Sequence, residues 1–327
     1  MKKNFIIVVI MIVILAIGFP VLDENYLYFV KMWFTLLCTG IIFLPISTII
    51  FKKSENIGWI FSKVLGIIIP ATIIWYLSYM KILKYTELNC FILIAILTLI
   101  TICVFVKKKQ YKNIDIKKIN SILITEIIFI TVFIAWTWVR SHMVEITPVT
   151  EQFMNYGFIN KLMNTEYLPA EDIWFSGHYI NYYYYGQYII SFIGKISFFN
   201  VNELYNIMMA LMSTFTFIMP FTIAFTLGKR IINKNEKNKI VPYILAILTG
   251  LSICIGGTMH YPIYCYTNIG EESYEYFDAV RYLSDDTEKV AHEMPSYSNI
   301  IGDLHAHYVN TMFSFITLAV LLEIILR

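Results

Sequence analysis

The stretch that decides the fold is YINYYYYGQYIISFIGKISFF, residues 179–199. It is apolar enough to suggest a membrane-spanning helix, but six of the ten residues from Tyr179 to Tyr188 are tyrosine. Tyrosine prefers the boundary between water and lipid to the bilayer centre, and Gln187 and Lys195 also oppose a crossing. We therefore predict that this segment is a helix that lies on, or dips into, the outer face of a membrane.

The composition supports a membrane protein. Hydrophobic residues make up 58% of the 327-residue chain and charged residues 15%, whereas soluble proteins have roughly 45–50% and about 25%. These values exclude a disordered chain, a collagen-like fibre and an ordinary soluble enzyme. The net charge of +2 implies no nucleic-acid partner. Four of the five cysteines lie in apolar runs, so no disulfide framework is indicated.

Long apolar runs locate the membrane spans, because a bilayer core of about 30 Å requires roughly 20 apolar residues as a helix. The sequence predicts an all-α integral membrane protein with about eight transmembrane helices: 4–22, 27–50, 58–79, 88–106, 119–140, 203–228, 240–259 and 309–327. The first run follows Lys2 and Lys3 but lacks a convincing cleavage site, so it is expected to be an uncleaved anchor.

Lysine and arginine in the short loops predict the orientation, because such residues favour the cytoplasmic side. Basic clusters follow the second, fourth and sixth runs: Lys52, Lys53, Lys107, Lys108, Lys109, Lys112, Lys117, Lys118, Lys229, Arg230, Lys234, Lys237 and Lys239. If all are cytoplasmic, the N-terminus is cytoplasmic and loops 141–202 and 260–308 are extracytoplasmic. Lys81 and Lys84 are the exception, since this topology places them outside. If residues 179–199 crossed the membrane, the predicted orientation of the segments that follow them would be reversed.

The polar chemistry divides the chain into two regions. Residues 1–118 form a four-span region with few polar groups at depth, which favours a lipid-facing or scaffold bundle. Residues 119–327 contain all six histidines and both large loops. Within the predicted spans, Glu126 is an ionisable group at depth, where such a residue is a functional candidate by default; it could also reach the interface or remain protonated.

The first polar cluster runs from Arg140 to Glu151 in loop 141–202. Arg140 ends a predicted span, where a guanidinium suits a phosphate at headgroup level; an interfacial arginine without a ligand is equally compatible. Glu151 precedes a predicted amphipathic helix, 152–164, on the membrane surface. A carboxylate there can be a general base or can merely interact with the helix dipole.

The second cluster is IGDLHAHY, residues 301–308. In a helix Asp303 and His307 would share a face while His305 pointed elsewhere. In an extended chain all three would point the same way. Either geometry is compatible with a metal or phosphate site.

These motifs resemble a known family. Asn181 with Tyr182–Tyr184, Glu293 in EMPSYSNIIGDLHAHY, and the Gly302-Asp303-Leu304-His305 tetrad are similar to the YYY-domain family of bacterial and archaeal multi-span membrane proteins. The resemblance covers roughly residues 136–327. That family is related by fold analogy to GT-C-type membrane glycosyltransferases, which carry surface-lying helices in the first large outer loop.

The resemblance implies a GT-C-like module, 119–327, that transfers a sugar from a polyprenyl-phosphate donor at the extracytoplasmic side of a bacterial or archaeal cell membrane. It makes Glu151 and Asp303 the catalytic candidates. Arg140 and Glu293 would bind substrate together with the tyrosine motif: Asn181, Tyr182, Tyr183 and Tyr184. A divalent cation, Mg²⁺ or Mn²⁺, would be held by Asp303, His305 and His307, or cationic side chains would stabilise the leaving phosphate instead. This reading requires Glu151 and Asp303 to lie within about 10 Å of each other, close enough for two groups to act on one substrate.

Three features depart from that family. Met154-Asn155 stands where an acid is usual, and His-Ala-His replaces the commoner His-Pro-His. The chain also ends soon after its eighth predicted span, and residues 119–327 supply four spans where a GT-C module needs more. The first four spans would then assist, another membrane chain would complete the fold, or the chain would be a truncated, non-catalytic subunit or scaffold. A transporter that uses Glu126 as its coupling group is a further alternative.

Overall fold

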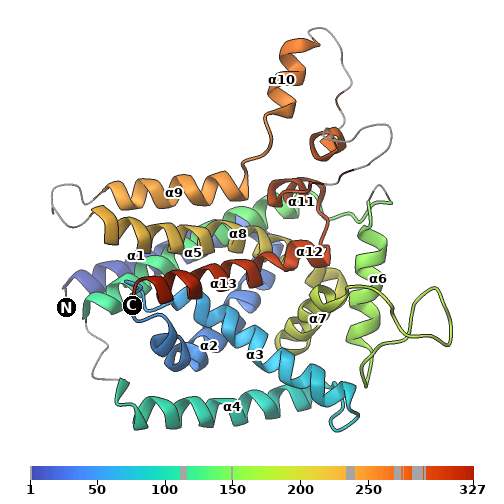
Figure 1. Ribbon diagram of the computed structural model, residues 1–327, viewed down its shortest axis with the longest axis horizontal. Helices are drawn as coiled ribbons and strands as arrows, with labels where there is room; N and C mark the ends of the chain where they lie inside the picture. Colours follow the sequence, from blue (N-terminus) through green and yellow to red (C-terminus); the bar gives the residue numbers. More distant parts are fainter. Residues whose placement is uncertain are drawn as a thin grey trace.

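A computed structural model describes residues 2–110, 116–148, 150–232, 240–268, 274, 276–281, 290 and 292–327. The described residues are helical, with no strand apart from one isolated bridge between Glu171 and Tyr179. Each of the eight predicted apolar runs contains a helix: α1 Lys2–Leu22, α2 Tyr26–Ile50, α3 Trp59–Tyr79, α4 Glu87–Lys107, α5 Ile116–Ser141, α8 Val201–Ile232, α9 Val241–Cys254 and α13 Thr311–Ile325. The long helices lie alongside one another in a layered bundle (Figure 1).

Six helical stretches of the described chain are long and apolar enough to cross a membrane. One is the continuous stretch Asn4–Ile50, which contains both α1 and α2. Arg327 donates to the carbonyl of Ile50 at 2.9 Å, and both chain ends lie at the same end of the bundle (Figure 1). The chain therefore reverses between α1 and α2. By contrast, α9 has 14 residues and rises only about 21 Å, so a count of eight spans remains a prediction.

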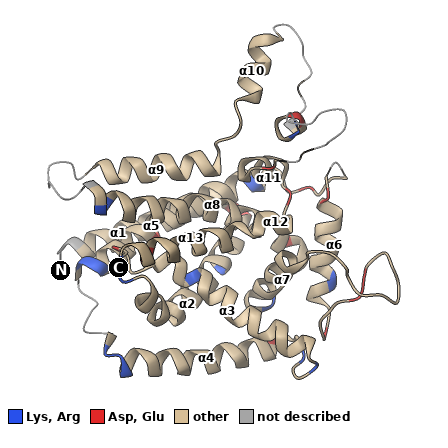
Figure 2. Ribbon diagram, in the orientation of Figure 1, with Lys and Arg blue, Asp and Glu red and all other residues tan. Residues whose placement is uncertain are grey.

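The two ends of the bundle differ in charge. Figure 2 shows Lys and Arg gathered at the left-hand ends of the long helices, near both termini, whereas acidic residues occur around α6 and α12 at the right-hand end. Lys112, Lys234, Lys237 and Lys239 lie outside the described residues. The exceptions Lys81 and Lys84 have local partners: Lys84 pairs with Glu166 at 2.8 Å and Lys81 donates to the carbonyl of Leu168 at 3.0 Å. They hold the first large loop against the turn after α3.

The segment 179–199 has a different structure from the one predicted. Only Tyr185–Ser197 is helical (α7), and its 13 residues are too few to cross a bilayer. The helix lies across the right-hand ends of the long helices, beside α6 (Gln152–Met163; Figure 1). It is not on the surface, however, because every residue from Gly186 to Ser197 is buried. The prediction of a surface-lying helix was wrong here: protein, not lipid or water, covers α7 on all sides.

Aromatic and polar contacts explain this burial. The ring of Tyr188 lies 4.6 Å from Trp75 of α3, and its hydroxyl donates to the carbonyl of Ala71 at 2.6 Å. Lys195 donates to the carbonyl of Met163 at 2.6 Å, and its ammonium lies 4.6 Å from the ring centre of Tyr85. Lys195, one of the two polar residues that oppose a crossing, is thus satisfied by groups of the first loop and of the turn before α4.

A charged pair lies inside the bundle, between α3 and α5. Lys63 is fully buried and its ammonium lies 3.0 Å from Glu126. The carboxylate also accepts hydrogen bonds from the indoles of Trp33, at 2.7 Å, and Trp59, at 2.6 Å. Lys63 is a polar group that sequence reasoning missed in a region expected to have few of them. Because both oxygens of Glu126 are paired, the network links α2, α3 and α5 as a structural unit.

Candidate functional site

The loop before α13 carries the site. Helix α11 (Pro295–Ile301) ends at Gly302, whose φ of +72° places it in the left-handed region. A Cβ at Gly302 would lie 2.3 Å from Nη1 of Arg140, so glycine is required here both by conformation and by space. The chain then continues without regular structure to His305, whose backbone is extended and which precedes the short helix α12 (Ala306–Val309). The segment 301–308 is therefore partly extended and partly helical, a combination of the two expected geometries.

Two neighbouring helices hold this loop in place. The hydroxyl of Tyr205 in α8 donates to the carbonyl of Gly302 and accepts from the amide of Leu304, both at 3.2 Å. Gln152, the first residue of α6, donates to the carbonyl of Ile301 at 2.6 Å. Residues about 150 positions apart in the sequence are thereby joined, which places Glu151 beside Asp303.

Asp303 is buried, with 7% of its surface exposed. Its Oδ1 accepts a hydrogen bond from Nδ2 of Asn155 at 2.7 Å, and Oδ1 of Asn155 accepts from Gln187 at 2.7 Å. Burial raises the pKa of Asp303 to about 6, because a low-dielectric surrounding disfavours the charged form. Asn155 and Gln187 are positioning residues that sequence reasoning missed, although Asn155 stands where the resembling family usually has an acid.

His305 links the two loops. Its Nδ1 lies 3.2 Å from Oε2 of Glu151 and 3.8 Å from Oδ2 of Asp303. Its Nε2 lies 2.8 Å and 3.0 Å from the hydroxyls of Tyr183 and Tyr182. Burial lowers the pKa of His305 to about 4, so the ring is neutral near pH 7. Since carboxylates face Nδ1 and hydroxyl donors face Nε2, we assign the proton to Nδ1.

The proximity required of Glu151 and Asp303 is met. Because both carboxylates lie within 4 Å of the same imidazole nitrogen, the two facing oxygens are at most 7.0 Å apart. The tyrosine motif contributes only in part. Tyr182 and Tyr183 contact His305, but Tyr184 is buried against Trp75, with ring centres 5.3 Å apart. Asn181 is exposed and does not line the site.

A second group of charges faces the same space. Glu293 lies 2.8 Å from Nε2 of His307 and 3.2 Å from Nη2 of Arg281. The hydrogen bond with His307, more than the contact with Arg281, holds the pKa of Glu293 at about 2 despite partial burial. His307 is thus paired with Glu293 and not with Asp303. Arg281, which no sequence motif marked, adds a cation to the wall.

These groups surround an open cavity of about 660 Å³ at the right-hand end of the bundle. It is lined by Thr150, Glu151, Tyr183, Phe277, Arg281, Glu293, Tyr297, Ile301, Asp303, His305 and His307. Its size is that of a small-molecule site, and its lining carries acids, imidazoles and one guanidinium. The cavity can therefore accept a polar ligand and exchange protons with it.

The described residues do not form a ready metal site. No group of three or more His, Cys, Asp or Glu side chains converges as ligands in the part of the chain that is described. Both nitrogens of His305 have partners, and His307 faces Glu293. The predicted cation at Asp303, His305 and His307 stays a prediction, and no chemical step below uses it.

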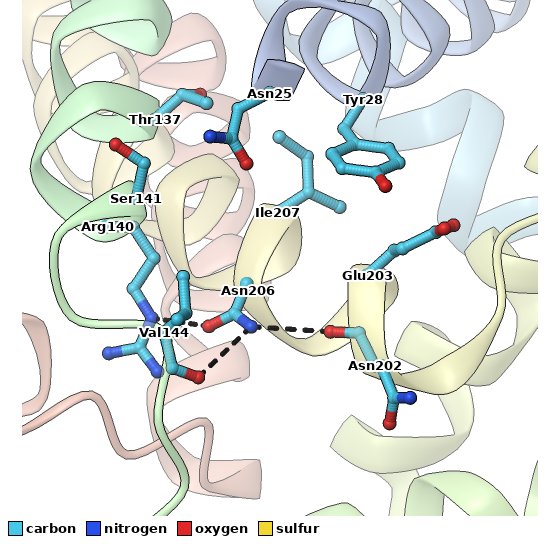
Figure 3. Close-up of a pocket in the computed structure, with 10 residues that line it drawn as sticks. All are labelled: Asn25, Tyr28, Thr137, Arg140, Ser141, Val144, Asn202, Glu203, Asn206 and Ile207. Atoms are coloured by element: carbon cyan, nitrogen blue, oxygen red, sulfur yellow. Dashed lines mark hydrogen bonds between the residues drawn. The ribbon is translucent and has the colours of Figure 1, made fainter. Parts of the chain in front are cut away.

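Arg140 lies beside the cavity rather than in its lining. It is 8% exposed, and its Nε donates to Oδ1 of Asn206 at 2.8 Å (Figure 3). Nη1 packs against Gly302, and the buried Nη2 has no hydrogen-bond partner among the described residues. A pocket of about 200 Å³ opens next to it, lined mainly by polar side chains of α2, α5, α8 and the turn before α2, Glu203 among them (Figure 3). A buried guanidinium with one nitrogen that lacks a partner among the described residues suits an anion at this depth.

One comparison with known proteins gives a match. The family described as Uncharacterized membrane protein (DUF2298) matches residues 69–327, which include every candidate site residue. No curated protein and no solved structure matches the chain. The match starts inside α3, ahead of the division predicted at residue 118, and a single hydrophobic cluster includes residues from both sides of that division. The two-region organisation therefore stays a prediction.

Proposed function

We propose that this chain, which belongs to the Uncharacterized membrane protein (DUF2298) family, is a membrane glycosyltransferase that takes its sugar from a polyprenyl-phosphate donor. The observation that carries the proposal is the convergence of Glu151, Asp303 and His305 at one cavity, from loops about 150 residues apart. The family and the apolar helices indicate an integral membrane protein, so a lipid-carried substrate can reach the cavity from the bilayer.

Asp303 is the proposed general base. Its carboxylate takes the proton of the acceptor hydroxyl while that oxygen bonds to the anomeric carbon of the sugar. The bond from the anomeric carbon to the phosphate oxygen breaks, and the polyprenyl phosphate leaves with the electron pair. A base works best when its pKa is close to the working pH, and the pKa of Asp303, about 6, meets this condition.

Glu151 and His305 position the acceptor side of the cavity. The carboxylate of Glu151 accepts the Nδ1 proton of His305, which fixes the ring and leaves Nε2 to hold the hydroxyl of Tyr183. Tyr183 lines the cavity and presents an aromatic face on which a sugar ring can pack. Arg140, whose Nη2 lies close to Gly302 and has no partner in the described part of the chain, is the proposed partner of the lipid phosphate.

The charge distribution supports an extracytoplasmic site. Basic residues concentrate at the end of the bundle opposite the cavity (Figure 2). By the positive-inside rule that end is cytoplasmic, so the N-terminus is cytoplasmic and loops 141–202 and 260–308 face outward. A transporter is less well supported, because both oxygens of Glu126 are engaged by α2 and α3. A non-catalytic subunit would not require a carboxylate as buried as that of Asp303.

Turnover by the purified protein tests the proposal. The protein in lipid nanodiscs is incubated with a panel of polyprenyl-phosphate sugars and of hydroxyl-bearing acceptors, and released polyprenyl phosphate is measured. We expect release by wild type and a loss of about 10- to 100-fold in Glu151→Gln, because His305 loses its charged acceptor. Glu145→Gln, an exposed acid in the same loop but outside the cavity, is the matched control. Absence of turnover with every donor, or a Glu151→Gln rate equal to wild type, would refute it.

The rate should rise with pH through about 6. The pKa of Asp303 is raised to about 6, so the base form accumulates as the pH increases past that value. His305, with a pKa of about 4, is already neutral over the same interval and adds no step. Measurement of kcat/KM from about pH 5 to about pH 8 should give one ascending limb. Glu145→Gln should keep this limb; a rate independent of pH would contradict the role of Asp303.

A further inference from the structure

A second cavity lies at the basic end of the bundle, far from the site described above. Its volume is about 470 Å³. It is formed where α2 ends, where α4 ends and where α5 begins, and its lining consists of Thr48, Ile49, Lys52, Ile57, Lys108, Gln110 and Lys118. Three lysines thus border one cavity, and none of the described residues of this lining is acidic. Figure 2 shows basic residues at this end of α4.

Gln110 is the feature that distinguishes this cavity from an ordinary basic surface. Lysines at this end follow from the positive-inside rule alone, but a buried amide does not. Gln110 is 4% exposed, and neither its Nε2 nor its Oε1 has a hydrogen-bond partner among the described residues. Buried polar groups are rarely left unpaired, so the amide requires a partner other than the described residues. That partner must both accept a hydrogen bond and donate one.

We propose that this cavity binds a phosphate ester in which a hydroxyl group of the same molecule lies close to the phosphate. The phosphate oxygens would accept from Nε2 of Gln110 and pair with Lys52 and Lys108, and the hydroxyl would donate to Oε1. Basic pockets between transmembrane helices on the cytoplasmic side are suited to anionic headgroups. The inference does not depend on the proposed transferase activity, because the cavity lies at the opposite end of the bundle.

The surroundings favour a lipid as the source of this group. Exposed apolar side chains border the cavity end of α4, where Ile102 and Val106 are 51% and 58% exposed. Exposed apolar faces on a membrane protein contact acyl chains. Ile49 and Ile57 add apolar walls to the cavity itself, which suit the glycerol carbons of a headgroup such as that of phosphatidylglycerol.

Lipid binding tests the inference. The full chain is placed in phosphatidylcholine nanodiscs, short-chain phosphatidylglycerol is titrated in, and bound lipid is measured by native mass spectrometry. Wild type should bind phosphatidylglycerol in preference to added phosphatidylcholine. Lys108→Gln should weaken this binding about fivefold, and Gln110→Leu should weaken it at least as much.

Lys109→Gln is the matched control, because Lys109 is an adjacent exposed lysine that does not line the cavity. It should bind like wild type. Equal binding of the two lipids would overturn the proposal, since it means that the cavity has no preference for the anionic headgroup. Equal weakening by Lys109→Gln and Lys108→Gln would also overturn it, since that result means general surface attraction. If Gln110→Leu does not fold, Lys108→Gln alone decides the outcome.

A second arm identifies the source of the phosphate ester. Glycerol 3-phosphate is added to the same phosphatidylcholine nanodiscs, and the thermal midpoint of unfolding is recorded. If the lipid is the source, phosphatidylglycerol should raise the midpoint more in wild type than in Lys108→Gln at the same lipid concentration, and glycerol 3-phosphate should have little effect. A rise with glycerol 3-phosphate that Lys108→Gln abolishes supports the same chemistry from a soluble ligand. No rise with either ligand in wild type contradicts the proposal.

Discussion

Replacing Asp303 by asparagine should lower the rate of sugar transfer about 10²- to 10⁴-fold, the usual contribution of a general base. The substitution removes the proton acceptor but keeps the size of the side chain, and the amide oxygen can still accept the hydrogen bond that Asn155 donates. The fold and the affinity for the donor lipid should therefore change little. The effect should appear in kcat and kcat/KM alike, because only the transition state loses a contact.

The control for this prediction is Asp278→Asn. Asp278 lies in the same loop, 260–308, in the short helical turn Tyr276–Val280, but it is exposed and does not line the cavity. Its replacement should leave the rate unchanged, and the ascending pH limb should be absent from Asp303→Asn alone. An Asp303→Asn rate within a few-fold of wild type would exclude Asp303 as the base and leave Glu151 as the remaining carboxylate candidate.

Lys63→Met should destabilise the folded protein by about 3–5 kcal/mol, the usual cost of removing one partner of a buried ion pair. Methionine fills the space of the lysine stem, but the carboxylate of Glu126 remains buried, with only the indoles of Trp33 and Trp59 as partners. An uncompensated charge in this position is far less favourable than the pair. Denaturant unfolding in detergent, followed by tryptophan fluorescence, measures the change.

Two further variants separate charge from packing. Lys63→Met combined with Glu126→Gln removes both charges and should recover part of the lost stability, because no unpaired ion remains. Lys84→Met removes a lysine from an exposed pair with Glu166 and should change stability little. If Lys63→Met were as stable as wild type, the pair would not hold α3 to α5.

The candidate site could be predicted in outline because its parts obey local rules. Glu151 precedes an amphipathic helix, and Asp303 and His305 follow a glycine before a span, so each was expected at the mouth of a helix in an outer loop. The expectation that the two loops lie on the same side depended on where basic residues lie, and the expectation that Glu151 approaches Asp303 depended on the family resemblance. The partner of His307 could not be predicted, since the choice between Asp303 and Glu293 depends on where α12 begins.

The residues that position Asp303 could not be predicted from the sequence, for a related reason. Asn155 and Gln187 have no distinctive pattern, and they become significant only because α6 and α7 bring them to Asp303. The tyrosine motif was recognisable, but consecutive residues of a non-helical segment point in different directions. Tyr183 therefore reaches the cavity while Tyr184 packs against Trp75.

The sequence by itself determined that the chain is helical and membrane-embedded, where its long helices lie, and which of their ends is basic. Hydropathy and charge act on each segment separately, so no knowledge of the neighbours is needed. Only the tertiary structure decided that residues 185–197 are covered by protein, that Lys63 finds Glu126, and that His305 stands between Glu151 and the hydroxyl of Tyr183. The two partners in these contacts are separated by between 63 and 154 positions in the sequence. Which residues meet depends on how the helices pack, and no single segment encodes that packing.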